Sequence, residues 1–384
     1  MKAAMATTSA TVPAARLIGE APVPLWGRPA SQILQRALAR AGVVDTAAWP
    51  APASGPVLLV RADHVYDAVL VTGLVAAPGT VLLRPGDGLP VAAHVPPERA
   101  AAVAAALDAG RGADDPAFAG LRRAGPEDLA GAYNKALRKR GAPYLLALTA
   151  ETRRAVEWRM FGGSYKGVTD VITKYVWPRP AFHVTRLCAA LGITPNQVTA
   201  ASLVLVLLAL WLFWHGHFVT GLLAAWIMTF LDTVDGKLAR VTLTSTPFGN
   251  VFDHMIDLIH PPFWWLAWIV GLEAAGLPLA HPWLVGAVVA GGYVVQRLEE
   301  GLFIQLYGMH IHVWERFDSL FRLVLARRNP NLVLLTLSVL VGRPDWGMVA
   351  VAVWTALCCV EQAVRIGQAF AAGGRGAVRS WLEA

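Results

Sequence analysis

The sequence predicts a membrane all-α bundle of six transmembrane helices, preceded by a soluble α/β domain. Of the 384 residues, 55% are hydrophobic and only 15% are charged, which is too apolar for an ordinary soluble protein of this length. Long apolar runs lie in the second half of the chain, whereas the first half alternates short strand patterns with alanine-rich helical patterns. We therefore expect two parts with different surroundings.

The soluble α/β domain is expected to cover residues 1–150. Residues 31–42 and 97–110 are helix patterns that end at a glycine. Residues 56–67 form a short apolar, β-branched run followed by acids, and residues 80–88 form a similar run closed by a turn, so both are expected to be strands. Alternating strands and helices predict a layered α/β domain.

The membrane part begins after a polar and basic helical connector, residues 151–197, which we expect to lie near the membrane surface. A helix needs about 20 apolar residues to cross the hydrocarbon layer. The six candidate spans within residues 198–371 are 198–216, 219–240, 250–273, 283–306, 330–343 and 345–371. A tail, residues 372–384, ends the chain.

Basic residues are distributed unevenly between the loops. They are concentrated before the first candidate span, after the fourth and in the tail, whereas the loops after the first and third spans contain no Lys or Arg. Because positive loops stay in the cytoplasm, we expect a multi-pass inner-membrane protein with both termini cytoplasmic. The net charge of +7 suits anionic lipid headgroups, and no basic run is interleaved with aromatic residues, so a nucleic-acid partner is not expected.

Residues 232–257 contain four aspartates at the expected inner ends of the second and third spans. Asp232 and Asp235 share one helix face, as do Asp253 and Asp257. An antiparallel helix pair can turn the two faces toward each other, and a divalent cation would relieve the repulsion between the carboxylates. Ligands that are all oxygen suit Mg²⁺ or Mn²⁺. The alternative is a charged loop that only contacts solvent, but ionisable groups at membrane depth are costly and usually functional.

The surrounding residues extend this pattern. Gly236 and Ala239 lie on the same side as the first aspartate pair, where small side chains leave room for a ligand near the backbone. The whole order, Asp-x2-Asp-Gly-x2-Ala-Arg-x8-Gly-x3-Asp-x3-Asp, resembles the signature of the CDP-alcohol phosphotransferase (phosphatidyltransferase) family without a departure. The matching residues are Asp232, Asp235, Gly236, Ala239, Arg240, Gly249, Asp253 and Asp257. The resemblance covers residues 160–371 and implies six spans, commonly a homodimer, and a polar cavity open to the cytoplasm.

The resemblance also implies a reaction. A CDP-linked donor, either CDP-diacylglycerol or a soluble CDP-alcohol, gives its phosphoalcohol part to the hydroxyl of an alcohol or phosphoalcohol acceptor, and CMP is released. By the pattern of the family, Asp232, Asp235 and Asp253 ligate metal in a two-metal site with Mg²⁺ or Mn²⁺. Asp257 ligates the second ion or acts as the catalytic base on the acceptor hydroxyl.

Two further sets of residues follow from the resemblance. The CDP moiety is expected to contact Asp232, Gly236, Ala239, Arg240, Asn196, Thr199 and Gly249. For Asn196 and Thr199, an ordinary helix start after Pro195 is an equal alternative. Basic residues in the same layer would bind an acceptor phosphate or membrane lipid headgroups. These are Lys166, Lys174, Arg186, Arg327 and Arg328. The segment before the first span resembles the family's amphipathic helix along the membrane.

The soluble domain is similar to nucleotidyltransferases of the sugar-phosphate type, which some archaeal and bacterial relatives fuse to this membrane domain. Asp63 then corresponds to a metal-binding aspartate. The glycine-rich basic loop that holds the triphosphate in active members is missing, so we expect a degenerate accessory domain. One alternative is a bifunctional cytidylyltransferase and phosphotransferase. The other is a membrane metal carrier, which would scatter its acids along a path at mid-membrane depth.

Overall fold

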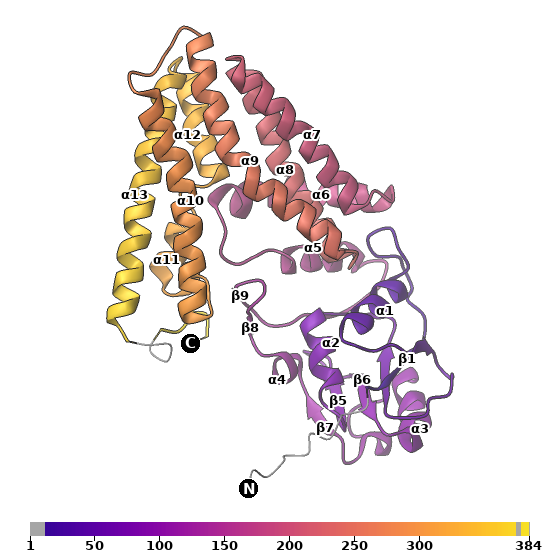
Figure 1. The fold of residues 1–384 in the computed structure, drawn as a ribbon. Helices are drawn as coiled ribbons and strands as arrows, with labels where there is room; N and C mark the ends of the chain where they lie inside the picture. Colours follow the sequence, from indigo (N-terminus) through magenta and orange to yellow (C-terminus); the bar gives the residue numbers. More distant parts are fainter. Residues whose placement is uncertain (1–11, 374–377, 384) are drawn as a thin grey trace. The chain divides into compact units, whose positions relative to one another are not determined.

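The computed structural model describes residues 12–373 and 378–383 (Figure 1). These residues divide into two compact units. The first unit consists of residues 12–134, 140–163 and 241–243. The second unit consists of residues 135–139, 164–240 and the described residues from 244 onwards. The first unit therefore includes helix α5, Arg153–Gly163, beyond the expected boundary at residue 150.

A sheet with six strands among the described residues forms the centre of the first unit. Its order is β2-β1-β3-β6-β5-β7, and neighbouring strands are parallel except for β6, which is antiparallel to both of its neighbours. The strands are β1 Ala14–Ile18, β2 Thr46–Ala48, β3 Val57–Arg61, β5 Thr80–Leu83, β6 Pro90–Val95 and β7 Arg122–Ala124.

Helices cover both faces of this sheet. Along β3, Leu58 and Val60 pack with the helices of one face, and Val57 and Leu59 pack with those of the other, because successive side chains of a strand point to opposite sides. Helices α1 Ala30–Arg40 and α2 Ala68–Val75 lie on the first face, and α3 Pro97–Asp108 lies on the second. The predicted α/β character of this part is confirmed.

The expected strand at residues 56–67 is two strands in the structure. Asp63 lies in the turn between β3 and β4 His64–Tyr66, and β4 leaves the main sheet to pair with β10 Leu145–Ala147. The other elements before β10 are η1 Pro116–Phe118, α4 Pro126–Ala130, β8 Tyr133–Asn134 and β9 Lys139–Arg140.

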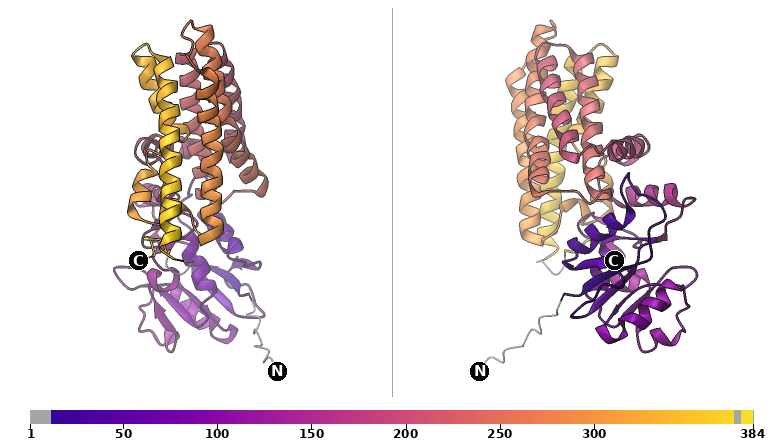
Figure 2. Two further views of the ribbon diagram at one scale, coloured as in Figure 1. Left: turned by 60° about the vertical axis from the view of Figure 1, so that its left-hand side comes forward. Right: turned by 90° about the vertical axis from the view of Figure 1, so that its right-hand side faces the viewer.

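The second unit is helical, and its long helices run roughly along one direction in both views of Figure 2. It begins with η2 Ile172–Val176 and α6 Pro178–Ala190, in the segment where an amphipathic helix was expected. The longer helices are α7 Pro195–Trp214, α8 Phe218–Val241, α9 Pro247–Ala274, α10 Pro282–Tyr307, α12 Arg328–Leu340 and α13 Pro344–Ala371. Between α10 and α12 lie η3 Ile311–Val313 and α11 Arg316–Phe321.

Within the described residues, four helices are long and apolar enough to cross a membrane: α7, α8, α9 and α13. They indicate a multi-pass membrane protein. Helix α10 is not among them, and it contains Arg297, Glu299 and Glu300. Helix α12 has 13 residues, about 20 Å at the α-helical rise, which is less than the roughly 30 Å of hydrocarbon. The fourth and fifth of the six expected spans therefore stay predictions.

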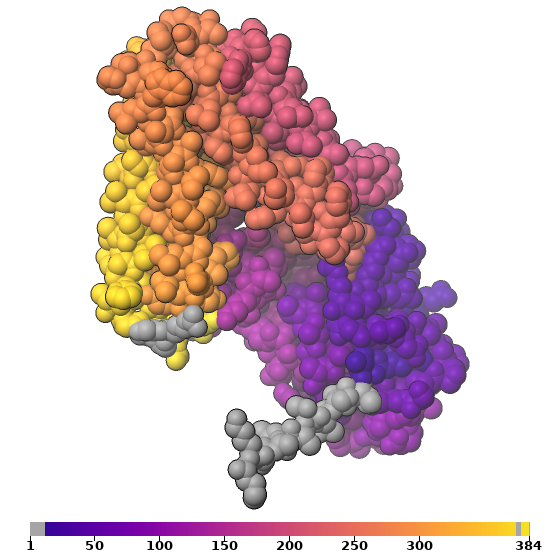
Figure 3. Space-filling view, in the orientation of Figure 1, coloured from indigo at the N-terminus to yellow at the C-terminus, as the bar shows by residue number. Residues whose placement is uncertain are grey.

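An aromatic core holds the long helices together. Trp264, Trp265 and Trp268 of α9 are fully buried among side chains of α7, α8, α10, α12 and α13. The indole Nε1 of Trp264 donates to the carbonyl of Val206 at 3.0 Å, so the polar edge of that ring is satisfied. Side chains fill the space between the ribbons of α10 and α13, which pack along their lengths (Figure 3).

Helix α9 changes direction along its length in Figure 1. Pro261 and Pro262 lie inside it, and proline bends a helix because it lacks the backbone N–H and crowds the preceding turn. Beyond the bend, Gly271 lies against the end of α7. A Cβ at this position would overlap the carbonyl oxygen of Phe213, so only glycine permits this approach of two backbones.

We predict that Gly271→Ala lowers the thermal unfolding midpoint of the purified protein in detergent. The added methyl group meets backbone atoms that cannot move aside, and overpacking of this kind typically costs about 1–3 kcal/mol. The matched control is Gly301→Ala in α10, where a Cβ has nothing within 4 Å. That variant should keep or slightly raise the midpoint, since alanine favours a helix over glycine. Equal midpoints for both variants would contradict the close packing of α7 and α9.

Candidate active site

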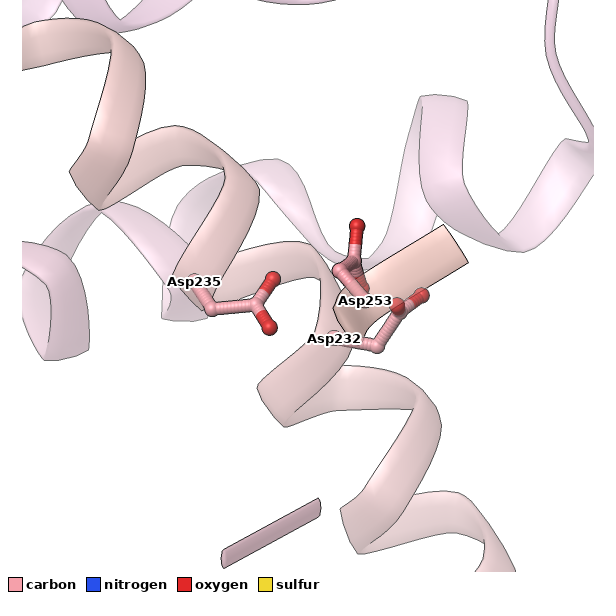
Figure 4. A group of neighbouring side chains, drawn as sticks. All are labelled: Asp232, Asp235 and Asp253. Atoms are coloured by element: carbon pink, nitrogen blue, oxygen red, sulfur yellow. The ribbon is translucent and has the colours of Figure 1, made fainter. Parts of the chain in front are cut away.

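The candidate site is built on the hairpin of α8 and α9. Thr246 caps the start of α9, where its side chain accepts a hydrogen bond from the backbone N–H of Gly249 at 3.0 Å. The hairpin turns the end of α8 toward the first turns of α9. Among the described residues, Asp232, Asp235 and Asp253 have carboxylate oxygens that all lie within 4.8 Å of one another. Figure 4 shows these side chains, from two helices, gathered around a shared space.

The three carboxylates fit a hard divalent cation. Asp235 is only 3% exposed, and its Oδ1 is buried with no hydrogen-bond partner among the described residues. An isolated buried negative charge is costly, so a buried carboxylate is normally paired or bound to a metal. A set of carboxylate oxygens is the donor set that Mg²⁺ and Mn²⁺ favour.

A third helix orients Asp235. Thr194 and Gln197 form a capping box at the start of α7, which fixes the first turn of that helix. One turn later, the Oγ1 of Thr199 donates to Oδ2 of Asp235 at 2.6 Å. This bond leaves Oδ1 of Asp235 directed away from Thr199. Thr199 thus contacts a carboxylate of the cluster, and its expected contact with CDP stays a prediction.

Asp257 lies outside the cluster of three carboxylates. Arg328, at the start of α12, donates from Nη1 to Oδ1 of Asp257 and from Nη2 to Oδ2 of Asp232, both at 2.5 Å. The sequence assigned Arg328 to an acceptor phosphate or to lipid headgroups. In the structure its guanidinium instead bridges two signature aspartates, so part of their negative charge is balanced by the protein itself.

The small signature residues leave room for side chains of the protein. The guanidinium of Arg240 lies over Gly236, where a Cβ would be 3.0 Å from Nη2. A Cβ at Gly249 would overlap Oδ1 of Asn196, so Asn196 reaches the start of α9 beside the carboxylates. Ala239 is half-buried one turn from Asp235. Five of the expected CDP contacts therefore lie around one hairpin, although the contacts themselves stay predictions.

A cluster of cations surrounds Lys166. Although Lys166 is accessible to solvent, desolvation by the surrounding protein lowers the pKa of its ammonium group. The charges of Arg138, Arg240 and Arg322 lower this pKa further, and the charge of Asp257 opposes them. Nη1 of Arg322 is buried without a hydrogen-bond partner among the described residues. An anion bound between these residues would reduce the repulsion between their positive charges and accept a hydrogen bond from the unsatisfied N–H.

The same cations lower the pKa of a histidine in the segment between α10 and α12. Burial lowers the pKa of His310 to about 4, and the charges of Arg138, His312, Lys166 and Arg322 lower it as well. His310 is therefore neutral at pH 7. The sequence pointed to Lys166 as a candidate binding residue but not to Arg138 or Arg322. The missing information is spatial, since the cluster joins four separate stretches of chain.

The other basic residues that the sequence suggested lie outside the cluster around Lys166. Lys174 is exposed, with its ammonium 5.5 Å from the centre of the Tyr175 ring. Arg186 is half-buried on α6. Arg327 is buried and donates to Oε1 of Glu300, so it is engaged inside the bundle and not at a lipid surface.

A buried lysine lies within the signature itself. Lys237 is 4% exposed, with its ammonium 3.6 Å from the centre of the Tyr165 ring. Its Nζ donates to the carbonyl of Ser164 at 3.5 Å. Lys237 thus ties α8 to the segment that precedes Lys166.

Asp63 of the first unit already has two side-chain partners. Its Oδ2 accepts from Nη2 of Arg61 at 2.6 Å, and its Oδ1 lies 2.7 Å from Nδ1 of His64. Burial raises the pKa of Asp63, but the hydrogen bonds from His64 and Arg61 outweigh it and hold that pKa well below its usual range.

The first unit also contains a cavity of about 550 Å³ at the carboxyl end of β1, lined by Gly19, Glu20 and Arg28 among others.

The signature segment matches known proteins. The family model of CDP-alcohol phosphatidyltransferases matches residues 192–327. The chain is 30% identical over 145 residues to the archaetidylinositol phosphate synthase of Aeropyrum pernix, a match that covers 37% of this chain and 71% of that protein. The chain belongs to the CDP-alcohol phosphatidyltransferase family. The three clustered carboxylates lie within the matched residues.

Two other relatives match over smaller shares of their lengths. The archaetidylinositol phosphate synthase of Pyrococcus horikoshii is 38% identical over 80 residues, which is 21% of this chain and 42% of that protein. The bifunctional IPC transferase and DIPP synthase of Rubrobacter xylanophilus is 29% identical over 220 residues, or 55% of this chain and 45% of that protein. The chain therefore spans less than half of the length of these two family relatives.

We predict that Thr199→Val weakens binding of Mn²⁺ about tenfold or more, measured by titration of the purified protein with electron paramagnetic resonance. The variant keeps the shape of the side chain but loses the hydrogen bond that orients Asp235, and losing such a partner typically costs 10–100-fold in metal affinity. The control is Thr220→Val, an exposed threonine in the first turn of α8. A dissociation constant that is the same in both variants would contradict the role of Thr199.

Proposed function

We propose that this protein transfers a phosphoalcohol group from a CDP-linked donor to an acceptor hydroxyl, with release of CMP, in phospholipid or polar-lipid synthesis. The observation that supports this best is the cluster of Asp232, Asp235 and Asp253, because it combines the signature of the family with a buried, unpartnered carboxylate oxygen. The donor is CDP-diacylglycerol or a soluble CDP-alcohol.

Asp232, Asp235 and Asp253 would hold Mg²⁺ or Mn²⁺ in a two-metal site. When bound, such ions supply positive charge that stabilises the attacking and leaving oxygens of the transfer. Arg240 lies over Gly236 and can donate from its guanidinium to the pyrophosphate of the donor. Arg328 holds Asp232 and Asp257 in fixed positions from a helix outside the hairpin.

Asp257 is the proposed general base. Arg328 engages its Oδ1, and the carboxylate is 40% exposed, so the acceptor can approach the remaining oxygen. The acceptor oxygen forms a bond to the phosphorus that bears the transferred alcohol, and the bond from that phosphorus to the CMP oxygen breaks. The hydroxyl proton moves to Asp257 and then to solvent, and CMP leaves with the electron pair of the broken bond.

The proposed acceptor is a phosphoalcohol of the inositol phosphate class. The relatives from Aeropyrum and Pyrococcus are named as archaetidylinositol phosphate synthases, and the cations around Lys166 offer a place for the phosphate of such an acceptor. The buried Nη1 of Arg322 can donate a charge-assisted hydrogen bond to that phosphate. Lys174 and Arg186 are assigned to lipid headgroups instead.

The first unit is proposed to be an accessory domain without catalytic activity. The Rubrobacter relative is named as bifunctional, which keeps a cytidylyltransferase as the alternative. Against that alternative, Asp63 already has Arg61 and His64 as partners, and metal binding would require breaking these contacts. Nucleotidyl transfer also needs backbone donors and a cation around the triphosphate, and the glycine-rich basic loop is missing from the sequence.

The location and assembly are further parts of the proposal. Six spans and a homodimer fit the family, and an inner-membrane location with both termini in the cytoplasm fits the distribution of basic residues.

A membrane metal carrier, which is not an enzyme, is the alternative function. The three carboxylates favour catalysis, since they lie together beside small residues of one hairpin instead of along a path through the bundle.

We predict that Asp253→Asn lowers the rate of CMP release at least about a hundredfold, because it removes one of three carboxylates that the cation needs and metal ions supply several kcal/mol of stabilisation. The assay uses purified protein with a CDP-linked donor, inositol 1-phosphate and Mg²⁺. The control is Asp345→Asn, which removes an aspartate in the first turn of α13 that is paired with Arg343. Full turnover of Asp253→Asn, or of the wild type in excess chelator, would refute the site.

We predict that the full chain releases no pyrophosphate from CTP and inositol 1-phosphate, and that Asp63→Ala does not change this. The missing phosphate loop leaves nothing to position the triphosphate. The measurement is a coupled assay for pyrophosphate in the absence of any CDP-linked donor. Pyrophosphate release that disappears in Asp63→Ala would show instead that the protein makes its own donor.

A further inference from the structure

The end of the chain packs against the segment between α10 and α12. Val378 is buried in a hydrophobic cluster with Phe303, Ile311, Trp314 and Ala369. Leu382 is also buried. A polar tail in solvent would not bury two aliphatic side chains, so residues 378–383, here termed the clasp, are part of the folded unit.

Directed hydrogen bonds fix the register of the clasp. The backbone N–H of Trp381 donates to the carbonyl of Trp314 at 3.0 Å, and Oγ of Ser380 donates to the carbonyl of Val313 at 2.8 Å. The indole Nε1 of Trp381 donates to Oγ of Ser319 at 2.9 Å. The guanidinium of Arg316 lies 5.4 Å from the centre of the same indole ring.

The segment under the clasp has little structure of its own. It contains only η3 and the six-residue α11, and a helix this short is not stable without outside contacts. Ser319 connects the clasp to its interior, because Oγ of Ser319 also donates to the carbonyl of His312 at 2.7 Å. Nε2 of His312 in turn lies 2.7 Å from Oε1 of Glu300 on α10.

This segment ends at the cation cluster. Arg322 follows α11 directly, and its charge acts on Lys166, His310 and His312. Arg365 of α13 also holds this short helix, through two hydrogen bonds to Asp318 at 2.6 and 2.9 Å. Contacts from α13 and from the clasp thus hold α11 and the segment before it, and Arg322 lies at the end of that helix.

We propose that the clasp orients Arg322 toward the phosphate of the acceptor, with Trp381 as the positioning residue. The inference rests on the proposed function, because it deepens the assignment of the cation cluster to a phosphoalcohol. Trp381 does not touch the substrate. It acts through Ser319 and Trp314 on α11, and through α11 on Arg322.

The test compares Trp381→Ala with wild type in the full-length protein. We expect the KM for inositol 1-phosphate to rise about tenfold, the effect of loosening one charge-assisted hydrogen bond, while the KM for the CDP-linked donor stays within about twofold. Ser319→Ala, which removes the acceptor of the Trp381 Nε1 bond and keeps the packing, should shift the acceptor KM in the same direction. The control is Trp283→Ala, a 90% exposed tryptophan at the opposite end of α10, which should leave both KM values unchanged.

Two readouts separate this inference from the proposed function. Amide hydrogen exchange of residues 311–322 should become faster in Trp381→Ala but not in Trp283→Ala, whether or not the protein turns over. Binding of radiolabelled inositol 1-phosphate without a donor should weaken to the same extent as the KM rises. Unchanged exchange would refute the clasp, and faster exchange with unchanged acceptor binding would refute the positioning role. Failure of the wild type to release CMP would instead refute the proposed function.

Discussion

The structure depends on how it compensates the negative charge that is gathered at the end of α8 and the start of α9. Asp232, Asp235 and Asp253 bring three carboxylates within 4.8 Å of one another in a helical unit that is largely apolar. Repulsion and desolvation would drive such groups apart or neutralise them. Arg328 balances part of the charge through Asp232 and Asp257, and the remainder fits a divalent cation.

The packing of the helices keeps these carboxylates and their hydrogen-bond partners in position. Thr199 can donate to Asp235 only if α7 and α8 stay in register, and the register of α7 is fixed against α9 by the close approach at Gly271. Trp264 and Trp268 fill the space between these helices, so the three elements that supply the carboxylates and their partner pack tightly against one another. Rigidity matters because metal ligands must keep their geometry through the reaction.

Helical spacing was enough to predict which faces of α8 and α9 hold the aspartates, because that information is local. Turn residues and alternation likewise indicated the α/β layers of the first unit. The bridge from Arg328 to Asp257 could not be predicted, since it joins residues 71 positions apart and depends on how α12 approaches the hairpin. The clasp was expected to be a simple tail for the same reason, because nothing in its sequence names Ser319 as the partner of Trp381. Contacts between distant segments follow from tertiary packing, and no local pattern encodes them.

The most direct measurement is anomalous X-ray diffraction from crystals of the wild-type protein soaked in Mn²⁺, with Asp345→Asn and Asp253→Asn crystals treated in the same way. We predict anomalous density at roughly 2 Å from oxygens of Asp232, Asp235 and Asp253 in the wild type and in Asp345→Asn. The same density should be lost or displaced in Asp253→Asn. Anomalous density elsewhere in the helical unit, with none beside these three carboxylates, would contradict the metal site on which the proposed transfer depends.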